Sequence, residues 1–154
     1  MKKFKFSLDT VLSYKQQVLD SLQGEYAQAM AEVHAQEALL ETLWQTYRNY
    51  SEEYRNRSQV GLPMTEVLMY QSALRAGEQT IPRETKRLEE LEAEAERRRE
   101  RMVEAKKETS SIEKLKEKKL DAYHKAEAKS EELFIEEFVS STRANARQTV
   151  QAGA

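Results

Sequence analysis

Residues 8–54 read LDTVLSYKQQVLDSLQGEYAQAMAEVHAQEALLETLWQTYRNYSEEY, and their apolar pattern decides the fold. Alternate steps of four and three residues from Leu8 reach fourteen positions, twelve of them apolar or aromatic. Such a seven-residue repeat is typical of a helix that packs along a partner helix as a left-handed coiled coil. We call these positions the first seam: Leu8, Leu12, Lys15, Leu19, Leu22, Tyr26, Ala29, Val33, Gln36, Leu40, Leu43, Tyr47, Tyr50 and Tyr54.

The composition agrees with long helices. The 154 residues are 39% hydrophobic and 34% charged, with four glycines and two prolines, which suits helices joined by few turns. Cysteine is absent, so disulfides and thiolate metal sites are excluded. The net charge is −2, from 25 basic and 27 acidic side chains, and this balance gives no field that favours nucleic acid.

Turn signals divide the chain. Helix one is expected over about residues 7–57, capped by Ser7 or Asp9. A loop and short helix are expected over about 58–80, and Ile81-Pro82 predicts a kink because proline has no N–H to donate. Helix two is expected over about 82–140, followed by a flexible tail at 141–154.

Helix two carries a looser second seam that starts at Leu88 and Leu91. The chain between the two helices, about 25 residues, could barely recross a helix roughly 70 Å long, so a parallel pair would leave no slack. We therefore predict an all-α fold, a single antiparallel two-helix coiled-coil hairpin over residues 1–140. Polar residues interrupt the second seam at Arg98, Lys116, Lys119 and Ser130.

Catalytic and metal motifs are missing. The sequence has no nucleophile motif and no phosphate-binding glycine loop, and His34 and His124 have no neighbours in a metal pattern. The arginine-rich run 97–101 can pair with its own glutamates, since Glu94 and Arg98 are four residues apart. We expect a non-enzymatic protein without cofactor, metal or nucleic-acid partner.

Two stretches leave alternatives open. Trp44 and the seam tyrosines that follow it either pack in the seam or form an exposed patch that anchors a partner. The lysines of SIEKLKEKKLDAY, residues 111–123, either are solvated or form a docking surface with Lys15. The opening MKKFKF lacks the apolar region of a signal peptide, and no run is long enough to span a bilayer, so a cytoplasmic location is expected.

Three stretches of the chain resemble the flagellar type III export protein FliJ family, which is related to injectisome stalk proteins. They are FKFSLDTVLSYKQ at 4–16, the pair Tyr70-Gln71, and EKLKEKKLDAY at 113–123 followed by EELFIEEF at 131–138. Their order and spacing cover nearly the full length. The resemblance implies a monomeric coiled-coil hairpin that couples to the hexameric export ATPase, contacts the membrane export gate and escorts export chaperones, peripheral to the inner membrane at the flagellar basal body.

The resemblance also implies two sets of contact residues. The end with both termini would enter the ATPase ring, bringing to it Lys15, Lys114, Lys118, Lys119 and Tyr123. The loop side would meet the gate through Tyr70, Gln71 and Leu74. Leu74 is included because Ala73 and Gly77 stand where family members can carry bulky apolar residues. The alternative is a coiled-coil scaffold or chaperone escort without an ATPase role.

Overall fold

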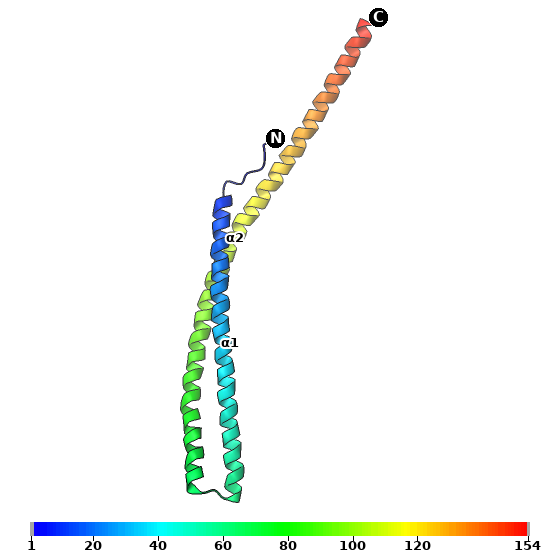
Figure 1. The fold of residues 1–154 in the computed structure, drawn as a ribbon. Helices are drawn as coiled ribbons and strands as arrows, with labels where there is room; N and C mark the ends of the chain where they lie inside the picture. The colour runs from blue at the N-terminus through cyan, green and yellow to red at the C-terminus, as the bar shows by residue number, and fades with distance from the viewer. Residues whose placement is uncertain (1, 154) are drawn as a thin grey trace. The chain divides into compact units, whose positions relative to one another are not determined.

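The computed structural model describes residues 2–153, which form two α-helices and, within that range, no strand (Figure 1). Helix α1 spans Asp9–Val60 and helix α2 spans Met64–Ala152. Gly61 ends α1 with a φ of +102°, a conformation that L side chains rarely adopt, and its N–H bonds to the Arg57 carbonyl. The predicted all-α helical hairpin is confirmed.

The chain divides into two compact units, each of which contains parts of both helices. The loop unit is Gln17–Lys106. The terminal unit comprises the residues up to Gln16 and those from Lys107 onward. Each unit is described by itself below.

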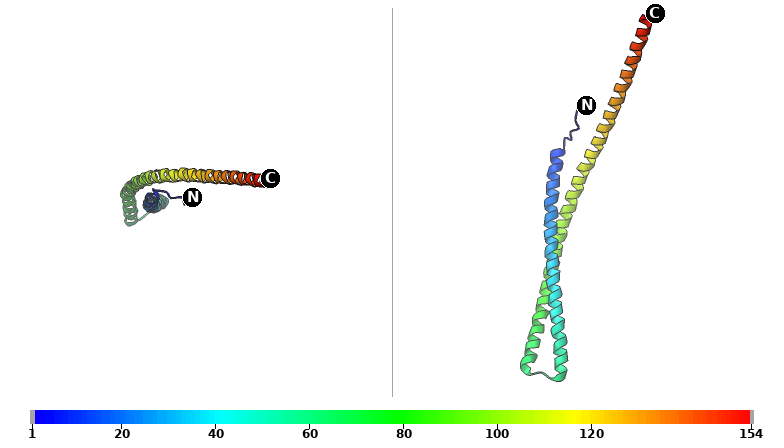
Figure 2. Two further views of the ribbon diagram at one scale, coloured as in Figure 1. Left: turned by 90° about the horizontal axis from the view of Figure 1, so that it is seen from above. Right: turned by 45° about the vertical axis from the view of Figure 1, so that its right-hand side comes forward.

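In the loop unit, α1 and α2 lie side by side and run in opposite directions, as Figure 1 and the right-hand view of Figure 2 show. Its core is the cluster of Ala29, Val33 and Ala95, each at most 4% exposed. Leu88 and Leu91 pack against this cluster, so residues of the first and second seams meet as the spacing predicts. Alanine on both helices lets the two backbones approach closely.

Helix α2 continues through Pro82, so the predicted division into a short helix before Ile81-Pro82 and a second helix after it is wrong. The second seam begins earlier than expected, because a seven-residue repeat runs unbroken through the proline. Its early members are Val67, Tyr70, Leu74, Gly77, Ile81 and Glu84. Proline inside a helix costs about 3 kcal/mol. Burial of Ile81 and Tyr70, at 5% and 3% exposed, offsets that cost, while Pro82 lies on the exposed side.

Polar seam residues of the loop unit have partners on the facing helix. Gln36 donates to the Glu84 carbonyl at 3.0 Å and to its carboxylate at 2.7 Å. Arg98 donates to the Glu25 carbonyl at 3.2 Å and to the Glu94 carboxylate. Because each bond needs one particular partner, these polar layers select the register of the two helices.

In the terminal unit, the start of α1 packs against α2, with Phe6 and Leu12 buried and Thr109 only 2% exposed. Farther along α2, residues 131–153 are all exposed. Residues 141–152 are helical, which differs from the expected tail of irregular structure. No glycine or proline occurs between Pro82 and Gly153, so nothing in this part of the sequence ends the helix earlier.

Candidate functional site

The expected ATPase-binding residues all lie in the terminal unit. One of them, Lys15, forms an ion pair there. Its Nζ lies 2.8 Å from a Glu108 carboxylate oxygen across the two helices. This hydrogen bond, with the attraction of the carboxylate, raises the pKa of Lys15 above its ordinary value. Lys116 pairs in the same way with Asp9, at 2.7 Å. The seam residues Lys15 and Lys116 therefore meet acidic partners, whereas the third seam lysine, Lys119, lies over the Phe6 ring.

Lys114 and Lys118 differ from the seam lysines. Both are exposed, and no carboxylate among residues 2–153 forms an ion pair with either. They are four residues apart and so lie on the same side of α2. These two ammonium groups therefore remain available to a partner.

A segment without helix or strand, residues 2–6, contacts Lys119 and Tyr123 of α2; we call it the strap. The Tyr123 hydroxyl donates to the Lys2 carbonyl at 2.6 Å, and its ring lies 5.6 Å from the Phe4 ring. Lys119 Nζ lies 5.9 Å from the centroid of the Phe6 ring, within cation–π range. Phe6 is buried at 8% exposed.

The strap leaves its lysines in solvent. Lys2, Lys3 and Lys5 are exposed, and with Phe4 and Tyr123 they line an open hollow of about 890 Å³. The sequence analysis missed this element. The signal was there in KFKF, since alternation with period two places phenylalanine on one side of an extended chain and lysine on the other. The surface that results is basic and aromatic, suited to an acidic partner.

The expected gate residues lie in the loop unit, but only one is fully exposed. Tyr70 is 3% exposed, and its ring lies 6.3 Å from that of Tyr50 and 5.5 Å from that of Tyr54. Arg57 donates to the Tyr70 hydroxyl at 3.0 Å. Tyr70 is therefore a packing residue of the loop end. Leu74 is partly buried, and Gln71 is exposed.

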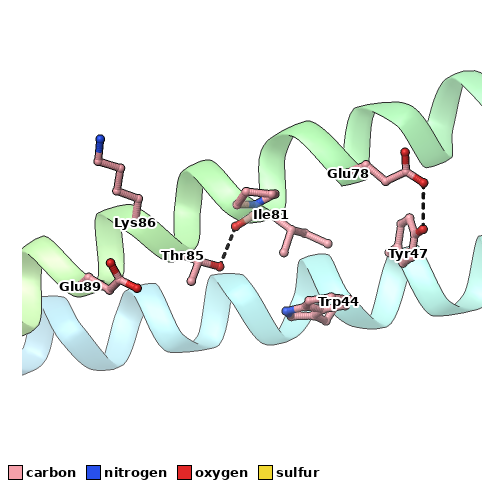
Figure 3. A pocket seen from close by; sticks show the side chains of 8 residues that line it. Trp44, Tyr47, Glu78, Ile81, Thr85, Lys86 and Glu89 are labelled. Atoms are coloured by element: carbon pink, nitrogen blue, oxygen red, sulfur yellow. Dashed lines mark hydrogen bonds between the residues drawn. The ribbon is translucent and has the colours of Figure 1, made fainter.

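The aromatic residues of α1 near the loop divide between the seam and the surface. Tyr47 packs in the seam, and its hydroxyl donates to Glu78 at 3.1 Å, a bond that raises the pKa of the phenol (Figure 3). Trp44 lies edge-on to Tyr47, with ring centroids 6.1 Å apart, and is 44% exposed. Trp44 lines a groove of about 640 Å³ with Ile81 and Pro82.

The charge clusters show no grouping of metal ligands in the described range. Within residues 2–153, no three potential metal ligands are grouped, and His34 only approaches Glu37, at 3.4 Å. The arginine-rich run is self-paired as predicted: Glu94 accepts hydrogen bonds from Arg97 and Arg98, which lower the pKa of Glu94. These side chains can bind and orient a partner surface.

A membrane-spanning helix is not found among the described residues, since neither α1 nor α2 contains a sufficiently long apolar stretch. Comparison with curated proteins and with solved structures found no match. A family model, described as flagellar FliJ protein, matches residues 4–148 of the 154. The match covers residues 4–6 of the strap, both seams and most of the exposed end of α2. The chain therefore belongs to the flagellar FliJ protein family.

Proposed function

We propose that this protein is a non-enzymatic coupling stalk of the flagellar type III export ATPase, which promotes assembly of the ATPase ring and its activity. Family membership supports a flagellar, export-related role. The observation that carries the finer proposal is the basic surface of the terminal unit. There Lys114 and Lys118 have no acidic partner among residues 2–153, and the strap lysines are exposed beside Tyr123.

The mechanism follows from a difference in symmetry. A single asymmetric helical element inside a ring of identical subunits makes different contacts with each of them. It therefore biases which subunit is open and which is closed, and this bias is a coupling free energy. Lysine ammonium groups suit the role, since charge pairs at the rim of an interface mainly change association rate and salt dependence. No nucleotide chemistry is assigned to the stalk itself.

The test is hydrolysis and oligomerisation of a matching export ATPase across a concentration series of the purified protein. We expect stimulation by the native chain and a loss of it in Lys114→Glu/Lys118→Glu. The matched control is Arg83→Glu/Arg87→Glu, two exposed basic residues of the loop unit at the same four-residue spacing. The proposal fails if the native chain leaves both hydrolysis and oligomerisation unchanged, or if the two double variants behave alike.

Contact with the export gate is the second part of the proposal, and it rests on Gln71 and Leu74. Tyr70 supports that surface from within, because it is buried under Tyr50 and Tyr54. We expect Gln71→Ala to weaken binding to the cytoplasmic domain of the gate without loss of helix. Equal binding of the native chain and this variant would remove Gln71 from the contact surface.

Escort of export chaperones is the third part, and it is tested by binding of purified chaperones without cargo. The alternative function, a scaffold without an ATPase role, is favoured if sedimentation shows a stable parallel dimer. The coupling stalk requires a monomer in the absence of its partners.

A further inference from the structure

One side of the loop unit consists of residues that directly follow seam residues. Leu68 follows Val67, for example, and Pro82 follows Ile81. Because the seam repeats every seven residues, the positions one step later also form a continuous stripe, displaced to one side of the seam. On α2 this stripe consists of Leu68, Gln71, Arg75, Glu78, Pro82, Thr85 and Glu89.

Helix α1 contributes to the same side. Trp44, Arg48 and Arg55 each follow a first-seam residue, and Trp44 lines the groove of about 640 Å³ together with α2 stripe residues such as Pro82 and Thr85 (Figure 3). The stripes of the two helices therefore border one groove. We call the two stripes together the outer flank.

The outer flank presents apolar surface to solvent. Leu68 is 58% exposed and Trp44 is 44% exposed. The indole N–H of Trp44 has no acceptor among the described residues, and the Thr85 hydroxyl is already bonded to the Ile81 carbonyl at 2.7 Å. A half-exposed tryptophan beside a groove, with a free donor, is the type of residue that anchors interfaces.

Two of the three arginines of the outer flank have no ion pair within the described chain. Arg55 and Arg75 form no ion pair with residues 2–153, and Arg48 contacts only Glu41, at 3.3 Å. Glu78 instead accepts the hydroxyl proton of Tyr47. The contrast is with the run at residues 97–99, where each arginine has a nearby glutamate. The part of the flank toward the loop thus offers unpaired positive charge.

We infer that the outer flank binds an acidic amphipathic α-helix of a partner protein, which packs as a third helix against the loop unit. The apolar stripe of that helix covers Trp44 and Leu68, and its carboxylates pair with Arg55 and Arg75. A helix is the fitting occupant because a seven-residue repeat of exposed positions matches the repeat of a helix packed alongside it. The inference does not rest on the proposed function. It shares Gln71 with the expected gate surface, but its test uses no gate protein.

Trp44 supplies the measurement, since it is the single tryptophan of the chain. The probe is a designed helical peptide without tryptophan, with leucine at a seven-residue repeat and glutamate at the flanking positions. The matched peptide carries lysine in place of every glutamate. Titrated into the full chain, the glutamate peptide is expected to shift Trp44 emission saturably to shorter wavelength, and the lysine peptide to leave it nearly unchanged.

Charge reversal makes the test specific. The double variant Arg55→Glu/Arg75→Glu is expected to bind the glutamate peptide about tenfold more weakly or worse. It should bind the lysine peptide more tightly than the native chain does. The control, Arg101→Glu, reverses an exposed arginine that precedes the seam residue Met102 and so lies on the other side. It should bind as the native chain does, and circular dichroism verifies that all variants are helical.

Three results overturn the inference: unmoved Trp44 emission at the highest soluble peptide concentration, equal response to both peptides, or equal binding of the double variant and the native chain. A fourth is concentration-dependent self-association that shifts Trp44 emission in the absence of peptide. That result would assign the outer flank to a second copy of this chain.

Discussion

Gly77 lies directly against the ring of Tyr47: a β-carbon on Gly77 would stand 2.8 Å from Tyr47 Cδ2. Real contacts of this kind are longer, so any side chain at position 77 would have to displace the ring. The ring is held by the bond from its hydroxyl to Glu78. The missing side chain of Gly77 thus provides the space into which a seam tyrosine packs.

Gly77→Ala is expected to destabilise the fold by about 1 kcal/mol. The gain in helix propensity is about 1 kcal/mol, and overpacking costs about 1–3 kcal/mol. The control is Gly24→Ala, where the added β-carbon meets nothing within 4 Å and the helix should be stabilised. In a Tyr47→Ala background, Gly77→Ala should also stabilise. Thermal unfolding by circular dichroism measures all of these changes. The packing argument is contradicted if Gly77→Ala and Gly24→Ala change the stability of the native chain in the same direction.

Tyr70→Ala is expected to cost about 3–5 kcal/mol, as for other buried aromatic side chains, because the residue is 3% exposed between Tyr50 and Tyr54. Tyr70→Phe removes only the hydrogen bond from Arg57 and should cost about 1 kcal/mol. Tyr14, which is 63% exposed, provides the control, since Tyr14→Ala should change stability by less than about 0.5 kcal/mol. Denaturant unfolding measures each. Equal stability of Tyr70→Ala and the native chain would place Tyr70 on the surface.

The hairpin could be predicted because the first seam is strict. Twelve of its fourteen positions are buried or partly buried, and Leu8 and Tyr50 are the exposed exceptions. The break at Pro82 was predicted from local chemistry alone. Tertiary packing overrides that chemistry, since the seam repeat from Val67 to Leu88 passes the proline without a change of register.

The candidate sites were less predictable, because they depend on which residues of α1 lie opposite which residues of α2. The lysine at position 15 needs an acidic partner in a seam, but only the folded pair shows that this partner is Glu108. The inward direction of Tyr70 could not be inferred while its segment was treated as separate from the second seam. Short segments such as the strap offer too few residues for periodicity to be decisive.

The hydrogen bonds to Glu94 predict that the fold loses some stability as the pH falls into the acid range. Arg97, and then Arg98, lower the pKa of this carboxyl below its ordinary 4.5. A carboxyl whose pKa is lowered by folding stabilises the fold at pH values above its ordinary pKa, and this contribution is lost as the pH falls through the folded-state value. Glu94→Gln should therefore be less stable than the native chain at neutral pH, with the difference vanishing in acid.

The control for Glu94 is Glu92→Gln, an exposed carboxyl of the same helix without an ion pair among residues 2–153. Its stability should follow that of the native chain at all pH values. Unfolding midpoints measured across the acid range make the comparison. If Glu94→Gln is as much less stable than the native chain in strong acid as at neutral pH, its loss of stability arises from packing and not from the carboxylate charge.

Release of the strap is expected when Tyr123 is replaced. Tyr123→Ala removes both the hydrogen bond to the Lys2 carbonyl and the contact with the Phe4 ring. Each contact stabilises the bound strap by about 1 kcal/mol. The fraction of molecules with a released strap should therefore rise about tenfold or more. Trypsin cleavage after Lys5, followed by mass spectrometry of the released N-terminus, tracks the open population. The control is Asp121→Ala, because Asp121 is exposed and lies two residues from Tyr123. Trypsin should cleave this variant at the rate of the native chain. Equal rates for Tyr123→Ala and the native chain would mean that Phe6, buried under Lys119, is sufficient to hold the strap.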